Sequence, residues 1–315
     1  MNLIVMLPAN NEEETISEVI KTIPRKIDGI DNVKILVMND GSTDGTVEVA
    51  KNAGADLVVT SKERRGLAQT FKSGLYTALE MNADIIVNID ADNQYDAGEI
   101  PELIQPIMRN EADIVLGSRF GGHIEYMPPK NKIGNRIATS ITNLLSGLHI
   151  SDAQTGYRAF SREAALRLSI LSKYTYTQET IIQAAQKKLK IVEIPIIFRR
   201  RTHGKSRLIS GLFDYAKNSG MTILTTYLNY KPLKTFAVMG GIIMLAGFLL
   251  GLRVLYNYLV TGQVSPYLPS AILTAILLIV GFQTIMIGLF AEMVKSNREL
   301  TEDILTKLRK EKKET

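Results

Sequence analysis

Short apolar runs alternate with amphipathic stretches over the first two hundred residues of this 315-residue chain. Six runs that are apolar on both faces predict strands over Leu3–Leu7, Val33–Met38, Ala55–Thr60, Asp84–Ile89, Ala112–Gly117 and Ile191–Phe198. The stretches between them predict helices over Glu12–Ile23, Thr43–Asn52, Leu67–Met81, Glu99–Arg109 and Lys132–Ser146. This alternation predicts an α/β fold in which helices sandwich a mainly parallel sheet.

Two apolar runs near the C-terminus are long enough to cross a membrane. Residues 236–252 and 268–291 contain no charged side chain. At ~1.5 Å per residue the second run spans roughly 36 Å, which exceeds a hydrocarbon core of about 30 Å. The first run reaches that length if it begins near Lys234 and continues past Arg253, whose long side chain can reach the interface. We expect two transmembrane helices; the alternative is a pair of buried helices in a soluble core.

The distribution of basic residues predicts the orientation of these helices. The connector 257–267 has no Lys or Arg, whereas basic residues precede the first run and follow the second. Because positive loops stay in the cytoplasm, the N-terminal part and the C-terminal tail are both expected there. The predicted organisation is a cytoplasmic domain over 1–207, interfacial amphipathic helices over 208–232, transmembrane helices over 234–256 and 268–293, and a cytoplasmic basic tail over 294–315.

Composition narrows the classes of partner and chemistry. The net charge is +5 and the pI is near 9.1, but the basic residues gather beside the apolar runs, which favours anionic lipid over nucleic acid. The chain has no cysteine, which excludes disulfides and thiolate metal sites. Its start, MNLIVMLP, shows no signal-peptide pattern.

Acidic residues follow the fourth predicted strand, in the segment NIDADNQYD. Ligands of parallel α/β sheets bind beyond the carboxyl ends of the strands, and Asp90 and Asp92 would project from the same side of an extended chain. Two carboxylates this close repel each other unless a cation lies between them or one is protonated. Mg²⁺ or Mn²⁺, held by one or two carboxylates and completed by water and phosphate oxygens, suits the pair. The alternative is a solvated acidic loop.

Asp40, in NDGSTDG, follows the second predicted strand. Its carboxylate could accept hydrogen bonds from a base or ribose, although Asp-Gly-Ser is also ordinary turn chemistry. The chain lacks G-x-G-x-x-G and G-x-x-x-x-G-K-[ST], which excludes a Rossmann dinucleotide site and a P-loop.

Arginines recur where a phosphate-handling site would need them, at Arg119, Arg136, Arg158, Arg201 and Arg207. A guanidinium fork matches phosphate oxygens in bidentate fashion. An arginine taken alone is more often a surface charge, and for Arg158 that is the expectation. Together they predict two phosphate groups, one on each of two substrates.

The motifs PANNE, NDGSTDGT, DADNQ, GSRF, TGYRAF, YTQE and RTHGKSR occur in this order. The series resembles that of the dolichol-phosphate mannose synthase type of glycosyltransferases, which are inverting GT-A-fold enzymes of family 2. The resemblance covers about residues 1–230, and the two apolar runs resemble those of polyprenyl-phosphate glucosyltransferases. DAQTGYRAF followed by YTYTQET is most similar to archaeal dolichyl-phosphate hexose synthases. The resemblance implies a GT-A catalytic domain over 1–207 in a prokaryotic, archaeal-type cell membrane.

The resemblance also implies roles for individual residues. The implied donor-nucleotide set is Pro8, Asn10, Glu12, Met38, Asp40, Asp90, Ala91, Asp92, Gln94, Arg201 and Arg207. Within it, Asp90, Asp92 and Gln94 match the D-x-D-x-Q metal and diphosphate motif. Asn10 stands where an aromatic residue is common, and Arg207 stands in place of the commoner lysine.

For the second substrate, the resemblance implies that Arg119 and Arg136, with Ser118, receive the acceptor phosphate and that Glu179 orders the sugar pocket. Asp92, Arg119 and Arg136 are the implied catalytic residues. The implied reaction moves a hexose from UDP-glucose, UDP-N-acetylglucosamine or GDP-mannose to dolichyl or another polyprenyl phosphate, with Mg²⁺ or Mn²⁺ as cofactor. The product would serve protein or cell-surface glycosylation. The sequence does not decide whether the chain forms a homo-oligomer.

A lipid monophosphate needs no general base, because its second pKa of about 6 leaves it nearly doubly charged at neutral pH. None of the three histidines, His123, His149 and His203, is assigned a catalytic role. A processive polysaccharide synthase would carry Q-x-x-R-W, but the chain has no Trp. A sugar nucleotidyltransferase would show a Gly-rich N-terminal loop, and a non-enzymatic scaffold would have lost the acids. Transfer to another lipid, such as diacylglycerol, stays an alternative.

Overall fold

The computed structural model describes residues 1–172, 175–201, 220–221, 225, 227–228 and 231–311. The chain forms two compact units. The first contains residues 1–226 with 305–315, and the second contains residues 227–304.

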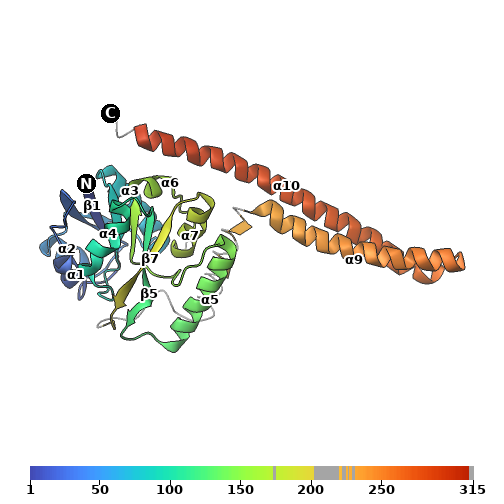
Figure 1. Cartoon of the computed structure of the whole chain (residues 1–315), viewed down its shortest axis with the longest axis horizontal. Coiled ribbons are helices and arrows are strands. Elements are labelled where there is room, and N and C mark those ends of the chain that lie inside the picture. Colours follow the sequence, from blue (N-terminus) through green and yellow to red (C-terminus); the bar gives the residue numbers. More distant parts are fainter. Residues whose placement is uncertain (173–174, 202–219, 222–224, 226, 229–230, 312–315) are drawn as a thin grey trace. The chain divides into compact units, whose positions relative to one another are not determined.

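The first unit is built on one seven-stranded sheet with the order β3-β2-β1-β4-β6-β5-β7 (Figure 1). Its strands are β1 Asn2–Ala9, β2 Asn32–Asn39, β3 Leu57–Thr60, β4 Ile85–Asn88, β5 Ile114–Ile124, β6 Arg158–Ser161 and β7 Ile191–Phe198. All neighbouring strands are parallel except β6, which runs antiparallel to β4 and β5. The predicted α/β class with a mainly parallel sheet is confirmed. β6 was not predicted, because four residues are too few to show a periodic pattern.

Helices cover both faces of this sheet. They are α1 Ile16–Thr22, α2 Thr46–Asn52, α3 Leu67–Glu80, α4 Ile100–Met108, α5 Pro129–Ser146, α6 Arg162–Arg167 and α7 Thr177–Gln186, with a 3₁₀ turn, η1, over Ala97–Glu99. Alternate residues of β1 enter opposite cores: Val5 packs with α1 and α4, whereas Met6 packs with α3, α6 and α7. This two-sided burial explains why the strands are apolar on both faces. α6 and α7 were not predicted.

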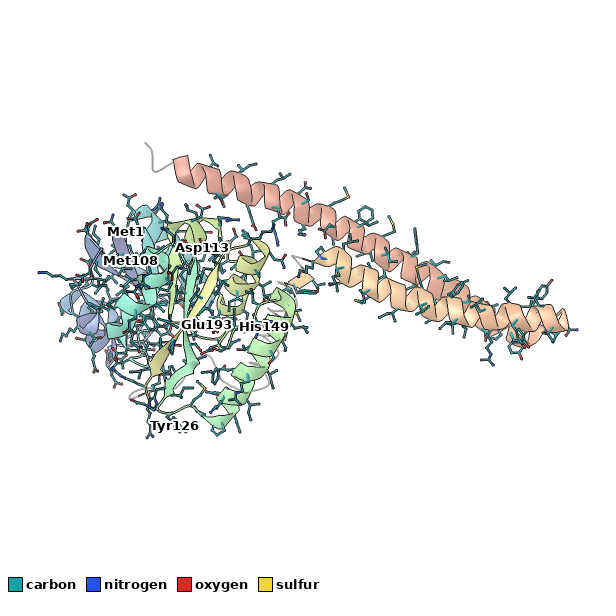
Figure 2. All side chains as sticks on the ribbon, viewed as in Figure 1. Met1, Met108, Asp113, Tyr126, His149 and Glu193 are labelled. Carbon is teal, nitrogen blue, oxygen red and sulfur yellow. The ribbon has the colours of Figure 1, made fainter. Side chains whose placement is uncertain are left out.

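The second unit contains α9 Pro232–Thr261, the 3₁₀ turn η2 Ser265–Tyr267 and most of α10 Leu268–Glu311. Pro232–Thr261 and Leu268–Thr306 are long and apolar enough to cross a membrane, and their side chains are mostly exposed (Figure 2). The helices pack closely at glycines, because a Cβ added to Gly240 would lie 2.6 Å from the carbonyl oxygen of Gly281. The predicted segment 208–232 lies largely outside the described residues, and the domain boundaries stay a prediction.

Candidate functional site

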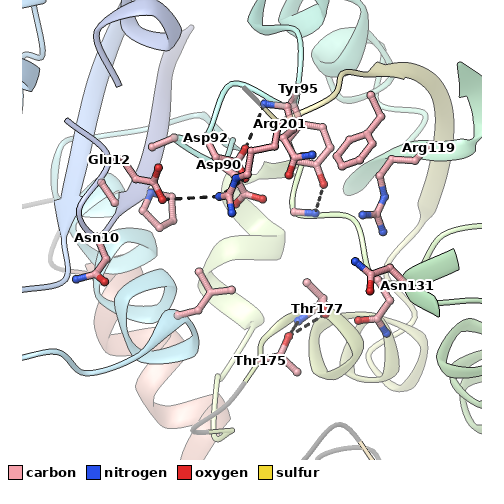
Figure 3. A pocket seen from close by; sticks show the side chains of 18 of the residues that line it. Asn10, Glu12, Asp90, Asp92, Tyr95, Arg119, Asn131, Thr175, Thr177 and Arg201 are labelled. Atoms are coloured by element: carbon pink, nitrogen blue, oxygen red, sulfur yellow. Dashed lines mark hydrogen bonds and ion pairs between the residues drawn. The ribbon is translucent and has the colours of Figure 1, made fainter. Parts of the chain in front are cut away.

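A cavity of about 560 Å³ opens in the first unit at the carboxyl ends of β1, β2 and β4 (Figure 3). Its size is that of a typical small-molecule pocket. Each of these strands delivers polar side chains directly after its apolar run, which is why the sequence motifs meet here. Ten of the predicted site residues line it: Pro8, Asn10, Glu12, Asp40, Asp90, Ala91, Asp92, Gln94, Arg119 and Arg201.

The acidic pair lies just beyond the end of β4. The Asp90 carboxylate lies against Gly156, where an added Cβ would be 2.7 Å and 2.9 Å from its two oxygens. Burial, followed by the neighbouring charge of Asp92, raises the pKa of Asp90 to about 7. Burial also raises the pKa of Asp92, although Arg201 opposes this shift. The protein therefore holds two carboxylates in a place that favours a bound cation.

Arg201 supplies positive charge to this pair. Its NH2 donates to Asp92 Oδ2 at 2.7 Å and lies 3.8 Å from Glu12 Oε1 (Figure 3). Thr15 Oγ1 donates to the carbonyl oxygen of Ala91 at 2.7 Å, which ties the loop after β1 to the loop after β4. Three segments distant in sequence thus meet around one carboxylate.

The donor set suits a cation that a substrate completes. Among the described residues there is no group of three or more His, Asp or Glu side chains placed to hold a metal. One or two carboxylates are nevertheless the usual protein share for Mg²⁺, which takes its other ligands from water and phosphates. Gln94 Nε2 donates to the Arg199 carbonyl at 3.3 Å and its backbone N–H donates to Asp92 Oδ1 at 3.2 Å, and neither contact uses the side-chain oxygen that would bind a metal.

Asp40 is buried and organises the neighbouring loop. Its Oδ1 accepts from Arg65 N at 2.7 Å and its Oδ2 from Gly66 N at 2.9 Å. Asn10 Nδ2 donates to the Asp40 carbonyl at 2.7 Å. Each carboxylate oxygen keeps a second lone pair, so a further hydrogen bond to a ligand is compatible with this role. The turn interpretation and the ligand interpretation therefore both stand.

Arg119, at the end of the buried part of β5, is held by Asp152. Nε donates to Oδ2 at 2.7 Å and NH2 donates to Oδ1 at 2.8 Å, and the pair is almost fully buried. The guanidinium also lies 5.2 Å above the Phe198 ring. Asp152 does not engage NH1, and Arg119 lines the cavity. Its orientation is thus fixed by protein contacts before any ligand binds.

Four other predicted site residues are not brought to the cavity wall. Met38 is buried in the core beneath α3, and Ser118 Oγ lies 2.5 Å from Ser151 Oγ. Arg136 is exposed on α5 and stacks over Phe120 at 5.8 Å. Glu179 is buried and accepts the backbone N–H groups of residues 171 and 172 at 2.9 Å and 3.0 Å. Arg207 lies outside the described residues.

Arg158 is not the surface charge that was expected. It is fully buried, and its guanidinium donates to the carbonyls of Thr155, Thr177 and Ala153 and to Thr180 Oγ1, at 2.7–3.0 Å. Burial lowers its pKa. Loop carbonyls compensate the charge in place of solvent, an arrangement that needs the folded chain and is not visible in sequence.

Sequence reasoning also missed part of the cavity wall. Asn131 and Asn135, on the first turns of α5, line it together with Thr175 and Thr177, whose hydroxyl oxygens lie 2.9 Å apart. The available signals were the repeated hydroxyls of YTYTQE and the asparagines of KNKIGN. These groups supply neutral hydrogen-bonding partners beside the charged ones.

The comparisons agree with this geometry. Residues 4–168, just over half of the chain, match the model described as glycosyl transferase family 2. The chain belongs to this family. Residues 215–295 match the model of the glycosyltransferase family 2 C-terminal transmembrane region, which includes α9 and much of α10. This family member is therefore a membrane protein with two apolar spanning helices.

Two curated relatives from archaea are similar to the chain. The chain is 33% identical over 216 residues to the UDP-N-acetylglucosamine–dolichyl-phosphate N-acetylglucosaminyltransferase of Methanococcus voltae, covering 61% of this chain and 83% of the relative. It is 29% identical over 299 residues to glycosyltransferase AglJ of Haloferax volcanii, covering 93% of each chain.

The fold is also that of a solved glycosyltransferase. Glucosyl-3-phosphoglycerate synthase from Mycobacterium tuberculosis, crystallised with Mn²⁺, UDP-glucose and glycerol 3-phosphate, matches with a TM-score of 0.55 and 22% identity. The match covers 72% of this chain and 79% of that chain. It confirms the predicted GT-A architecture.

Proposed function

We propose that this family 2 member transfers a hexose from a nucleotide-diphosphate sugar to dolichyl or another polyprenyl phosphate. The observation that carries the proposal is the division of charge in one cavity. Two arginines with different protein partners line it beside Asp90 and Asp92: Arg201 bonds to Asp92, whereas Arg119, which also acts on the charge of Asp90, has its orientation fixed by Asp152. Two charged groups of substrate can therefore be handled by two different sets of side chains.

The donor would place its diphosphate beside Asp92 and Arg201. In that place, Asp90 and Asp92 would hold Mg²⁺ or Mn²⁺, which neutralises charge on a diphosphate leaving group. Arg201 is close enough to Asp92 to exchange that contact for a phosphate oxygen, a partner with which a guanidinium bonds well. Asp40 and Asn10 line the same cavity and would contact the base or ribose.

The acceptor phosphate would bind at Arg119. Its phosphate oxygen attacks the anomeric carbon as the bond from that carbon to the diphosphate oxygen breaks, which inverts the configuration. A phosphomonoester is already ionised, so no protein group has to remove a proton. No histidine occurs among the residues that line the described cavity. The protein's task is then to align the groups and stabilise charge.

The relatives' names support this choice of acceptor and leave the sugar open. The Methanococcus voltae protein is named for dolichyl phosphate, and a Micrococcus luteus relative, 28% identical over 226 residues, for undecaprenyl phosphate. UDP-glucose, UDP-N-acetylglucosamine and GDP-mannose are all candidates, with UDP-sugars slightly favoured. We further propose that the catalytic domain and the C-terminus face the cytoplasm, as the basic flanks of the two helices indicate.

The test is to incubate membranes containing the full chain with each sugar nucleotide, Mg²⁺ or Mn²⁺, and dolichyl phosphate. We expect one radiolabelled sugar to enter the organic phase as a product that mild acid cleaves. A parallel reaction contains diacylglycerol in place of dolichyl phosphate. If diacylglycerol is the acceptor, that reaction yields a glycolipid that is stable to mild acid. Labelled product that resists mild acid would overturn the phosphate-acceptor assignment.

Paired variants connect that activity to the cavity. Asp92→Ala removes a carboxylate from the acidic pair, whereas Glu111→Ala removes an exposed carboxylate that does not line the cavity. Because the leaving group would lose its counter-charge, Asp92→Ala should reduce transfer by on the order of 10³-fold, while Glu111→Ala stays near wild type. Equal activity of the two variants would contradict the donor-site assignment.

A further inference from the structure

Helix α5 has its polar side toward the protein and its apolar side toward the outside. The side chains that face the protein are small or polar: Asn135, Ala138, Thr139 and Thr142. Those that face outward are aliphatic, with Ile133, Ile137, Ile141 and Leu144 exposed by 61%, 57%, 39% and 81%. A surface helix normally buries its apolar side and exposes its polar one.

The four aliphatic residues, here called the α5 stripe, form one continuous line. Their spacing of four, four and three residues places them on the same helical face, over roughly 16 Å of helix at ~1.5 Å per residue. The inner side is anchored by polar contacts, since Thr139 Oγ1 accepts from Ala153 N at 3.1 Å. The helix therefore cannot bury the α5 stripe by a small rotation without breaking these contacts.

The charge around the α5 stripe has one sign. Lys130, Lys132 and Arg136 are exposed on the same helix, and residues 126–150 include no Asp or Glu. Glu125, just before this segment, accepts a hydrogen bond from Arg200 N at 3.0 Å. A basic helix with an exposed aliphatic face suits the boundary between anionic headgroups and acyl chains.

We propose that α5 lies on the membrane surface, with the α5 stripe inserted among the lipids and its basic residues on anionic headgroups. Charge favours this occupant over a second copy of the chain, because two such helices would bring like charges together. The chain also carries the transmembrane region of its family, which keeps the catalytic unit near a bilayer.

This contact also bears on substrate entry, an extension that rests on the proposed function. Asn131 and Asn135, on the first turns of α5, line the cavity, as do Tyr126 and Met127 just before it (Figure 2, where Tyr126 is labelled). A helix lying in the interface would hold that part of the cavity at headgroup level. A polyprenyl phosphate could then present its phosphate to the cavity while its chain stays in the lipid.

Site-directed labelling of the full chain tests the contact directly. The chain has no cysteine, so Ile137→Cys, Leu144→Cys and the control Lys51→Cys each give one labelling site. Lys51 is exposed on α2, which packs with the core on the opposite face of the sheet from α3 and α7. The labelled proteins are reconstituted in vesicles of phosphatidylcholine with or without phosphatidylglycerol, and fluorescence quenching is measured with lipid-borne nitroxide and with aqueous iodide.

The proposal predicts stronger nitroxide quenching and weaker iodide quenching at residues 137 and 144 than at residue 51, and a larger difference with phosphatidylglycerol. Labels that iodide reaches and nitroxide does not would overturn it. Labels shielded from both quenchers would show that protein covers the α5 stripe, either a second copy or another segment of this chain, and would overturn it as well. Quenching is measured without any enzyme turnover, so this test of the membrane contact stays valid even if the proposed function is wrong.

Catalysis gives a second measurement, conditional on the proposed function. Ile137→Glu with Leu144→Glu should lower kcat/KM for a long-chain polyprenyl phosphate in vesicles by on the order of tenfold or more, because two aliphatic side chains leave the lipid. Transfer to a short, water-soluble polyprenyl phosphate should be unchanged. Leu57→Glu, at an exposed apolar side chain on β3, is the matched control. Equal losses with both acceptors would indicate a folding defect and would contradict the entry role.

Discussion

Asp152 holds the guanidinium of Arg119 through two parallel hydrogen bonds in a nearly solvent-free setting. Asp152 is in turn fixed from β7, because Glu193 Oε1 accepts its backbone N–H at 3.0 Å. One carboxylate thus sets the direction of the arginine proposed to receive the acceptor phosphate.

Asp152→Asn should therefore impair acceptor use. It removes the carboxylate that accepts from both Nε and NH2 of Arg119 and so frees the orientation of the guanidinium, and kcat/KM for the lipid phosphate should fall by on the order of 10²-fold. The KM for the sugar nucleotide should change little, because Asp90, Asp92 and Arg201 are untouched. Steady-state kinetics with each substrate varied in turn measures both quantities. Equal increases in the two KM values would contradict a role specific to the acceptor.

Gly156→Ala should displace the acidic pair. The added methyl group would lie within 3 Å of both carboxylate oxygens of Asp90, and the tight packing of this region leaves the carboxylate as the part that must move. We expect weaker Mn²⁺ binding and at least a tenfold loss of transfer, in proportion to the displacement. Gly241→Ala, which adds the same group to open space in α9, is the control. Normal Mn²⁺ affinity in the cavity variant would show that Asp90 does not hold the ion.

Arg201→Ala should separate metal binding from catalysis. Arg201 and a divalent ion would compete for the same Asp92 oxygen, so removing the arginine should raise the affinity for Mn²⁺ in the absence of donor. Transfer should nevertheless fall by on the order of 10²–10³-fold, because the diphosphate loses a cationic partner. Mn²⁺ titration followed by electron paramagnetic resonance gives the first quantity, and Arg109→Ala, at an exposed arginine, provides the baseline. A lower Mn²⁺ affinity would refute the competition.

Arg158→Met should destabilise the catalytic unit. The variant removes the donor to the buried carbonyls of Ala153 and Thr155, each costing about 1–3 kcal/mol when unpaired, which corresponds to a fall in melting temperature of roughly 4 °C or more. Arg158→Lys should recover only part of this loss, because an ammonium group cannot span the same partners. Thermal unfolding of the detergent-solubilised protein measures both. An unchanged transition in Arg158→Met would contradict a structural role.

The strands with two buried faces, and the acids that follow them, could be predicted from the sequence, because β1, β2 and β4 carry their motifs directly at their ends. It was insufficient for β6, whose four residues follow a loop and pair antiparallel with β4. That pairing places Gly156 against Asp90 and buries Arg158. The contact of Gly156 with Asp90 and the pairing of Arg158 with Asn88 each join residues about 65 positions or more apart, and spacing along a chain does not report them. The sequence also could not show that the apolar side of α5 faces outward. Periodicity identifies an apolar stripe on a helix, but not whether that stripe faces the protein or the surroundings.

The central claim is that Asp90 and Asp92 bind a cation that assists departure of the nucleotide while an ionised lipid phosphate attacks without a base. Its most direct test compares dolichyl phosphate with dolichol as acceptor, using purified full-length protein stripped with EDTA and then supplied with Mn²⁺. The account predicts transfer only to the phosphate and only after Mn²⁺ is restored. Equal turnover in EDTA, or a preference for the alcohol, would contradict it.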